Sequence, residues 1–216
     1  MSESVCTPTE KPKKRRTPSN KPRRIIRRGS VLPAQLIRKY CQEKNMVEPF
    51  AERTVYQGKT YGIGPCSYDL RIKQHIVLLP HRKYRLWKFL KLLDKIYSWF
   101  NCRPFFSHYH CGFALVSSIE KVNMPDDVCA MVMDKSSWAR RGLAVQNTHF
   151  DPGFCGYPTL ELSNEGTSTI EIPAGVAICQ LKFELLYEPT EMPYRGKYQN
   201  QPDKPVEAIE GKDTWA

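Results

Sequence analysis

Hydrophobic and polar positions alternate over short runs along most of this chain, and the pattern predicts many short β-strands. The runs are rich in Val, Ile, Leu and aromatic residues, and Gly, Pro, Asn or Asp separates one run from the next. Short strands with such punctuation are typical of a β-sandwich or a β-barrel. We therefore expect a mainly β fold, with strands at residues 68–72, 76–79, 113–117, 128–133, 157–163, 169–172 and 176–186.

Near the start of this region, one segment follows a helical period instead. Leu36, Ile37 and Tyr40 recur at the three- and four-residue spacing that places side chains on one face of a helix. Ser30 is a candidate for the N-cap, and Pro33 suits the first turn. The pattern predicts one short helix here, about ten residues long.

A second helical pattern lies between residues 82 and 103, in the middle of the strand-rich region. Leu86, Phe89 and Leu93 belong to an apolar stripe at helical spacing, and Lys or Arg occupies much of the opposite face. This pattern predicts an amphipathic helix inserted among the strands. Such a stripe usually packs on its own domain or on a neighbouring subunit, and the alternative is a membrane-surface or partner-docking role.

The positive charge of the chain is concentrated at its start. The whole chain has a net charge of +11, and residues 1–29 hold ten Lys or Arg against two Glu. The same residues contain four prolines and scarcely any apolar side chain, so we expect a disordered basic tail. Its function could be a weak contact with nucleic acid or, in a eukaryotic cell, nuclear targeting, and the alternative is a dispensable extension.

Length and composition restrict the remaining classes. With 216 residues, 41% of them hydrophobic, the chain suits one domain, which we place at residues 30–205 before a C-terminal tail at 206–216. No apolar run is long enough for a membrane span or a secretory signal, so we expect a cytoplasmic protein without a membrane partner. The eight cysteines include no Cys-x-x-Cys pair, which is consistent with free thiols in a reducing compartment.

Residues 134–142, here called the anion turn, hold the densest set of candidate binding groups. They include Lys135, Ser136, Ser137 and Arg140, directly after an expected strand. An arginine offers a fork of donors to phosphate, a lysine adds a point charge, and serine hydroxyls donate without adding charge. The segment therefore predicts an anion site, and the alternative is an ordinary polar turn.

Glu161 is a second candidate, in the expected strand that follows a tight turn at residues 150–156. Alternation along the strand places its side chain opposite to those of Leu160 and Leu162. If that face lines a pocket, desolvation would raise the pKa of the carboxyl and let it exchange a proton near neutral pH. The alternative is a glutamate that faces solvent.

A third cluster, residues 194–201, lies after the last expected strand. Basic and amide side chains alternate there with tyrosines, a combination that could close over a nucleotide by stacking and charge. By composition alone, the same segment would pass for a disordered tail.

Together these clusters resemble the dCTP deaminases, a family within the trimeric dUTPase superfamily. The resemblance covers residues 30–80 and 112–205, and several separate motifs occur in the order and spacing of the family. The matching segments are residues 30–32, 47–50, 67–71, 120 with 125–128, 134–142, 151–156, 160–164, 178–181 and 196–201. The stretch between Arg140 and Asp151 is shorter than in a typical member, and residues 81–111 have no counterpart.

The resemblance implies a distorted β-barrel of the dUTPase-like type that assembles as a homotrimer, with nucleotide sites at the subunit interfaces. Glu161 would be the proton shuttle, and Ser136 and Arg140 would help to hold the attacking water. Asp151 would bind the sugar 3′-hydroxyl. The remaining substrate-binding residues implied in this way are Lys135, Ser137, Thr159, Leu160, Gln180, Tyr194, Lys197 and Gln201.

The implied reaction is the hydrolysis of dCTP to dUTP and ammonia. Water adds to ring carbon 4, ring nitrogen 3 takes a proton, and a proton reaches the departing ammonia; one carboxyl group in reach can make each transfer. Zinc-dependent deaminases require a His-x-Glu with a Pro-Cys-x-x-Cys, and this sequence contains neither. We therefore expect a zinc-independent hydrolase in which magnesium only compensates the charge of the triphosphate.

Three alternatives stay open. A dUTP pyrophosphatase would use the same barrel with Asp151 activating water, although Glu161 favours deamination. A bifunctional enzyme that forms dUMP is compatible with Gln180. A non-catalytic nucleotide sensor or nucleic-acid-binding protein would bind nucleotide and release neither ammonia nor pyrophosphate.

Overall fold

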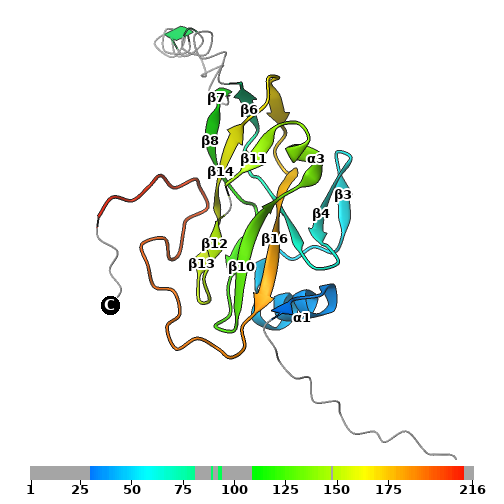
Figure 1. Cartoon of the computed structure of the whole chain (residues 1–216), viewed down its shortest axis with the longest axis vertical. Coiled ribbons are helices and arrows are strands. Elements are labelled where there is room, and N and C mark those ends of the chain that lie inside the picture. The colour runs from blue at the N-terminus through cyan, green and yellow to red at the C-terminus, as the bar shows by residue number, and fades with distance from the viewer. Residues whose placement is uncertain (1–29, 81–88, 90–91, 94–108, 147, 212–216) are drawn as a thin grey trace, which may run out of the picture.

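The computed structural model describes residues 30–80, 89, 92–93, 109–146 and 148–211, and the described part is mainly β (Figure 1). The helices are α1 (Ala34–Lys44) and α3 (Ser136–Ala139). The strands are β1 (Ser30–Val31), β2 (Val47–Glu48), β3 (Thr54–Tyr56), β4 (Lys59–Ile63), β5 (Tyr68–Arg71), β6 (Ile76–Leu79), β7 (Tyr109–Cys111), β8 (Phe113–Ser117), β9 (Lys121–Asn123), β10 (Val128–Asp134), β11 (Leu143–Val145), β12 (His149–Phe150), β13 (Cys155–Gly156), β14 (Thr159–Asn164), β15 (Ile170–Ile172) and β16 (Ala177–Leu185). The strands expected from alternation are confirmed, and most of the additional ones are too short to show a pattern.

The strands in the described ranges form four sheets around one hydrophobic core. The largest sheet has seven strands in the order β12-β10-β16-β5-β4-β3, with β1 added beside β16. Three smaller sheets have the orders β11-β14-β8, β13-β9-β2 and β15-β6-β7. Their inward side chains, including Tyr68, Leu160, Leu162 and Phe183, are fully buried, and together the sheets form a distorted β-barrel, as expected.

The expected N-terminal helix is confirmed as α1, but its cap is not Ser30. Ser30 pairs with Leu185 in the sheet, and Pro33 occupies the N-cap position. The helix ends at Lys44, and its C-cap residue Asn45 adopts a left-handed φ of 51°. Because Ser30 belongs to strand β1, the helix begins later than a cap at Ser30 would imply. Figure 1 shows α1 at the end of the molecule where β16 finishes.

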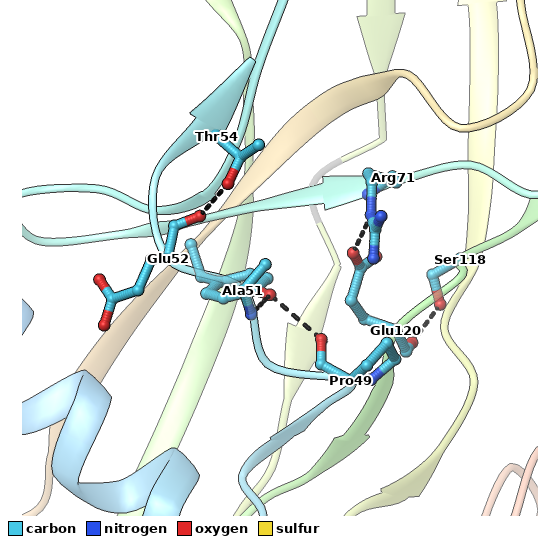
Figure 2. Close-up of polar contacts among 8 residues, drawn as sticks. Pro49, Ala51, Glu52, Thr54, Arg71, Ser118 and Glu120 are labelled. Atoms are coloured by element: carbon cyan, nitrogen blue, oxygen red, sulfur yellow. Dashed lines mark hydrogen bonds and ion pairs between the residues drawn. The ribbon is translucent and has the colours of Figure 1, made fainter. Parts of the chain in front are cut away.

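A buried ion pair joins β5 to the turn before β9. Arg71 Nε donates to Glu120 Oε1 at 2.6 Å, and the Arg71 backbone N–H donates to Glu120 Oε2 at 2.9 Å. The Ser118 hydroxyl donates to the Glu120 carbonyl at 2.6 Å. Figure 2 shows Arg71 and Glu120 facing one another, so the carboxylate is held from two directions inside the barrel.

Several expectations fall on residues outside the described ranges. These are the basic tail at residues 1–29 with its nucleic-acid contact, nearly all of the amphipathic helix at 82–103, and the last part of the tail at 206–216. Residues 206–211 are described and follow an irregular path. Within the described ranges, none of the helices is sufficiently long and apolar to cross a membrane.

Candidate active site

Glu161 lies in a pocket of about 540 Å³, on the face of β14 that points away from the core. Leu160 and Leu162 on either side of it are fully buried, so alternation places its carboxyl in the pocket as predicted. Across the sheet, Glu161 pairs with Leu115 of β8. The pocket is lined by Phe113, Leu115, Thr148, His149, Phe150, Asp151, Phe154, Thr159, Glu161, Tyr194, Tyr198, Gln201, Val206, Glu207 and Ala208, and is called the Glu161 pocket below.

The surroundings of Glu161 favour its neutral form. Burial raises the pKa of the carboxyl above its ordinary value, because the charged form loses hydration. The Thr148 hydroxyl donates to Glu161 Oε2 at 3.3 Å and partly offsets this increase in pKa. A half-buried carboxyl with a raised pKa and an open side is suited to accept and return a proton.

Asp151 lies at the same pocket, after β12. Its Oδ1 atom is 3.3 Å from His149 Nε2, and both side chains are about half exposed. Asp151 begins the tight turn in which the Phe154 N–H donates to the Asp151 carbonyl at 3.1 Å. The turn presents the carboxylate at the pocket, where it can accept hydrogen bonds.

Residues 194–208, here called the C-terminal segment, are docked against the barrel and form one wall of the pocket. Gln201 Oε1 accepts the Thr159 N–H at 3.1 Å, and the Val206 N–H donates to Thr159 Oγ1 at 3.0 Å. Gly156, with a φ of 147°, allows the backbone of Gln201 to approach, since a Cβ there would lie 2.5 Å from Gln201 N. Figure 1 shows the chain after β16, in orange, passing beside β12 and β13.

Gln199 fastens the same segment to the Asp151 turn. Its Oε1 atom accepts the Cys155 N–H at 2.9 Å, and its Nε2 atom donates to the Gly153 carbonyl at 2.8 Å. Tyr194 packs its ring 6.0 Å from that of Phe154. Lys197 Nζ lies 5.5 Å from the centroid of the Tyr198 ring and does not line the pocket.

The anion turn is built on the four-residue helix α3. The buried Trp138 anchors it, since Trp138 Nε1 donates to the Ala177 carbonyl at 3.0 Å. Ser136 and Arg140 are exposed. Within the part of the chain that the structure describes, the Ser137 hydroxyl oxygen is buried and has no hydrogen-bond partner. Such an atom is available to a ligand that reaches the turn.

Lys135 and Gln180 also lie at the anion turn, and both already have partners within the chain. Lys135 Nζ forms an ion pair with Asp69 and donates to Thr60 Oγ1 at 3.0 Å. Gln180 lies on β16, where its Oε1 atom accepts the Ser67 hydroxyl at 3.0 Å and its Nε2 atom donates to the Asp134 carbonyl at 3.1 Å.

The predicted site residues therefore form two groups in a single chain. Glu161, Asp151, Thr159, Tyr194 and Gln201 line the Glu161 pocket. The second group comprises Lys135, Ser136, Ser137, Arg140 and Gln180 at the anion turn, and none of these lines that pocket. The side chain of Leu160 faces the core, so only its backbone is placed to contact a ligand.

Sequence reasoning missed some lining residues. Thr148 precedes β12 and lies in a stretch whose sequence shows no clear periodicity. Phe113 and Leu115 reach the pocket because β8 pairs with β14. Alternation in residues 113–117 indicates that these two side chains share a face, but only the pairing shows that Glu161 shares it. Residues 206–208 carried no signal.

Comparisons with known proteins show similarity to one family. A family model described as dCTP deaminase-like matches residues 31–186. A dCTP deaminase of Campylobacter curvus (strain 525.92) is 36% identical over 173 residues, which covers 76% of this chain and 90% of that protein. A dCTP deaminase of Acidobacterium capsulatum is 33% identical over 162 residues, covering 73% of this chain and 88% of that protein.

Solved structures with a similar fold are more distant in sequence. The crystal structure of 2'-deoxycytidine 5'-triphosphate deaminase from Agrobacterium tumefaciens is 18% identical, with a TM-score of 0.47, and the match covers 73% of this chain and 48% of that one. A native EIAV dUTPase is 18% identical, with a TM-score of 0.40, over 60% of this chain and 82% of that one.

Proposed function

The chain belongs to the dCTP deaminase-like family, and from this membership we propose that it hydrolyses dCTP to dUTP and ammonia. The observation that carries the proposal is the placement of Glu161. Its half-buried carboxyl lies in a pocket, and burial raises its pKa. A general acid and base is most effective when its pKa lies near the working pH. The activity assigned by name to the relatives supports the same substrate.

In the proposed mechanism, the cytosine ring binds in the Glu161 pocket. The ionised Glu161 takes a proton from the water that attacks ring carbon 4 and passes it to ring nitrogen 3. It then takes the second proton from the new hydroxyl on ring carbon 4 and delivers it to the amino group, so that ammonia leaves, the carbonyl at carbon 4 forms and the carboxylate is regenerated. The backbone of residues 159–161 lines the ring, and Asp151 accepts a hydrogen bond from the sugar 3′-hydroxyl.

The phosphate groups require the anion turn, which lies outside the pocket of its own chain. We therefore propose that the enzyme is a homotrimer in which the anion turn of one subunit completes the Glu161 pocket of another. Among the described residues, the buried Ser137 hydroxyl has no hydrogen-bond partner, and Arg140 is exposed and would turn toward phosphate. Ser136 and Arg140 would also hold the attacking water. Lys135 would share its ammonium between Asp69 and the phosphates.

The C-terminal segment would close the site over the nucleotide. Tyr194 and Gln201 already line the pocket, and Lys197, which lies on the same segment, would turn toward the phosphates. Gln180 lies beside the anion turn and would act from that side. Magnesium would arrive with the triphosphate as a charge-compensating ion, since phosphate oxygens and water suit it as ligands. No zinc enters the proposed chemistry.

Asp151 supports one second candidate. It lies in the same pocket as Glu161, and a carboxylate there could activate water against the α-phosphate, as a dUTP pyrophosphatase requires. An enzyme with both activities would form dUMP from dCTP. The products distinguish these reactions: dUTP and ammonia for deamination, pyrophosphate for the second activity, and none for a non-catalytic sensor.

The test is to incubate the purified protein with dCTP and magnesium, assay ammonia, and separate triphosphate from monophosphate products by chromatography. We expect ammonia and dUTP, and a decrease in turnover of about 100-fold or more for Glu161→Gln, the usual loss for a general acid and base. Glu171→Gln is the matched control, because Glu171 also lies between two buried strand residues but its side chain is 67% exposed. Ammonia release at the wild-type rate by Glu161→Gln would refute the assignment.

A further inference from the structure

The Thr148 hydroxyl donates to the proposed proton shuttle, and it lies between two acceptors. Its Oγ1 atom is 3.3 Å from Glu161 Oε2 and 3.4 Å from the Gln146 carbonyl oxygen. The Gln146 N–H in turn donates to the Glu161 carbonyl at 2.9 Å, which fixes the backbones of the two strands relative to each other. The Thr148 side chain thus lies between two groups whose positions are set by the sheet.

A threonine hydroxyl has one proton to donate and lone pairs to accept another. When Glu161 is ionised, that proton can point to Oε2 and stabilise the carboxylate. When Glu161 is protonated, the carboxylic acid can donate to Thr148 Oγ1, and the threonine proton can turn to the Gln146 carbonyl. In both states, the Thr148 hydroxyl and Glu161 Oε2 stay hydrogen-bonded to each other, so the carboxyl keeps this partner through the cycle.

We propose that Thr148 is a positioning residue that holds the Glu161 carboxyl in one place through both of its protonation states. The proposal rests on the deamination proposed above and deepens it, since a shuttle must give and take protons without moving. Two observations favour this role over simple packing. Thr148 lines the same pocket as Glu161, and its branched side chain has few χ1 rotamers, which keeps the hydroxyl directed.

Other groups that face the pocket also affect the charge on Glu161. The titratable ones are His149 and Asp151 from β12 and its turn, and Tyr194, Tyr198 and Glu207 from the C-terminal segment. The side chains from β8 are the apolar Phe113 and Leu115. All of these residues are the same in the wild type and the Thr148 variants. A difference in pH profile between the variants therefore reports the effect of the Thr148 hydroxyl on Glu161.

The experiment compares Thr148→Val, which keeps the shape and removes the hydroxyl, with Thr148→Ser, which keeps the hydroxyl. For Thr148→Val, we expect the acid limb of the kcat/KM profile for dCTP to move to higher pH, because the ionised Glu161 loses a donor. We expect kcat to fall about five- to tenfold, the effect of one hydrogen bond, with KM nearly unchanged. Thr148→Ser should recover most of the wild-type rate and profile.

Thr54→Val is the matched control, because the Thr54 hydroxyl also donates to a carbonyl two residues earlier, that of Glu52, at 2.8 Å on an exposed hairpin (Figure 2). Its profile should match that of the wild type. A wild-type pH profile for Thr148→Val, with Glu161→Gln inactive, would overturn the proposal for Thr148 and leave the deamination standing.

Carbon-13 NMR titration of the Glu161 carboxyl provides a readout that needs no turnover. The pKa of Glu161 should be higher in Thr148→Val than in the wild type and Thr148→Ser, and equal values would also overturn the proposal. Absence of ammonia release by the wild-type protein would instead refute the deamination, and the titration would then still report whether Thr148 holds the carboxyl.

Discussion

The carboxyl groups of Glu120 and Glu161 are both withdrawn from water, yet they lie in opposite kinds of environment. Glu120 is fully buried in the barrel and accepts two hydrogen bonds from Arg71. Glu161 is half buried, faces a pocket, and accepts one hydrogen bond from Thr148. Burial raises the pKa of both carboxyls, and in Glu120 the charge and hydrogen bonds of Arg71 oppose that increase.

The comparison shows that burial alone does not make a carboxyl suitable for proton transfer. Glu120 is fully buried, and both of its carboxylate oxygens accept hydrogen bonds from Arg71. Glu161 has fewer donors and an open side, so a proton can come and go at the pocket. The first group therefore serves the fold and the second is available for chemistry, and variants at the two positions should separate these roles.

The largest effect on stability is expected for Glu120→Ala. The substitution leaves the Arg71 guanidinium in a mostly buried position without its partner, and breaking a buried pair in this way costs about 3–5 kcal/mol of unfolding free energy. Urea titration followed by circular dichroism measures the change. Glu120→Gln, which keeps a hydrogen-bond acceptor, provides a milder variant if the alanine protein does not fold.

Glu52→Ala is the control for that prediction, because Glu52 also accepts two hydrogen bonds from one arginine, Arg38, but on the exposed surface. Figure 2 includes both Glu52 and Glu120. Exposed pairs contribute little, so the change should be far smaller than for Glu120→Ala. Equal losses at the two positions would contradict the assigned role of burial.

A smaller effect is expected in the pH dependence of stability at Glu161. Because the pKa of this carboxyl is raised by folding, the folded chain binds its proton more tightly than the unfolded chain does. The resulting stabilisation is present at pH values below the ordinary pKa of 4.5 and is lost as the pH rises through the folded-state value. Glu161→Gln stays neutral, so its stability relative to wild type should increase over that interval.

Unfolding free energies of the two proteins, measured in urea at a series of pH values, test this expectation. The remaining titratable groups are common to both proteins, so their contributions cancel in the difference. A difference that stays constant with pH, or that decreases as the pH rises, would mean that folding does not raise the pKa of Glu161.

The smallest effect is expected for Gln199→Ala, which acts on the wall of the Glu161 pocket. The substitution removes the hydrogen bonds to Cys155 N and the Gly153 carbonyl that fasten the C-terminal segment, each with a net value of about 1 kcal/mol. We expect KM for dCTP to rise about fivefold, with little change in kcat, because binding rather than proton transfer is affected. Gln42→Ala, on the exposed face of α1, is the control.

Steady-state kinetics of Gln199→Ala and Gln42→Ala test this expectation. A decrease in kcat at unchanged KM would place Gln199 in the chemical step, against this expectation. Unchanged kinetics would show that the C-terminal segment stays in place without its side chain.

The sequence predicted the placement of Glu161 better than that of Glu120. Alternation placed Glu161 on the face opposite to Leu160 and Leu162, and the structure confirms this. The role of Glu120 was not evident, because its partner Arg71 is 49 residues away in the chain. The prediction of Ser30 as the N-cap was wrong because Ser30 pairs with β16, which is also distant in the chain.

The C-terminal segment illustrates the same limit. Its composition resembles that of a disordered tail, yet Gln201 reaches the Thr159 N–H, 42 residues earlier in the chain. Hydrogen bonds between such distant positions leave no periodic pattern in the sequence. The grouping of site residues into the Glu161 pocket and the anion turn likewise depends on which strands pair.

The sequence by itself determined the mainly β class, the helix near the start, the family resemblance and the direction of the Glu161 side chain. These follow from local rules, because the side-chain direction in a strand depends only on position along it. The tertiary structure alone decided what surrounds that side chain, namely Thr148, the β8 residues and the C-terminal segment. The physical reason is that desolvation and hydrogen bonding depend on neighbours in space, which strand pairing brings together from distant parts of the chain.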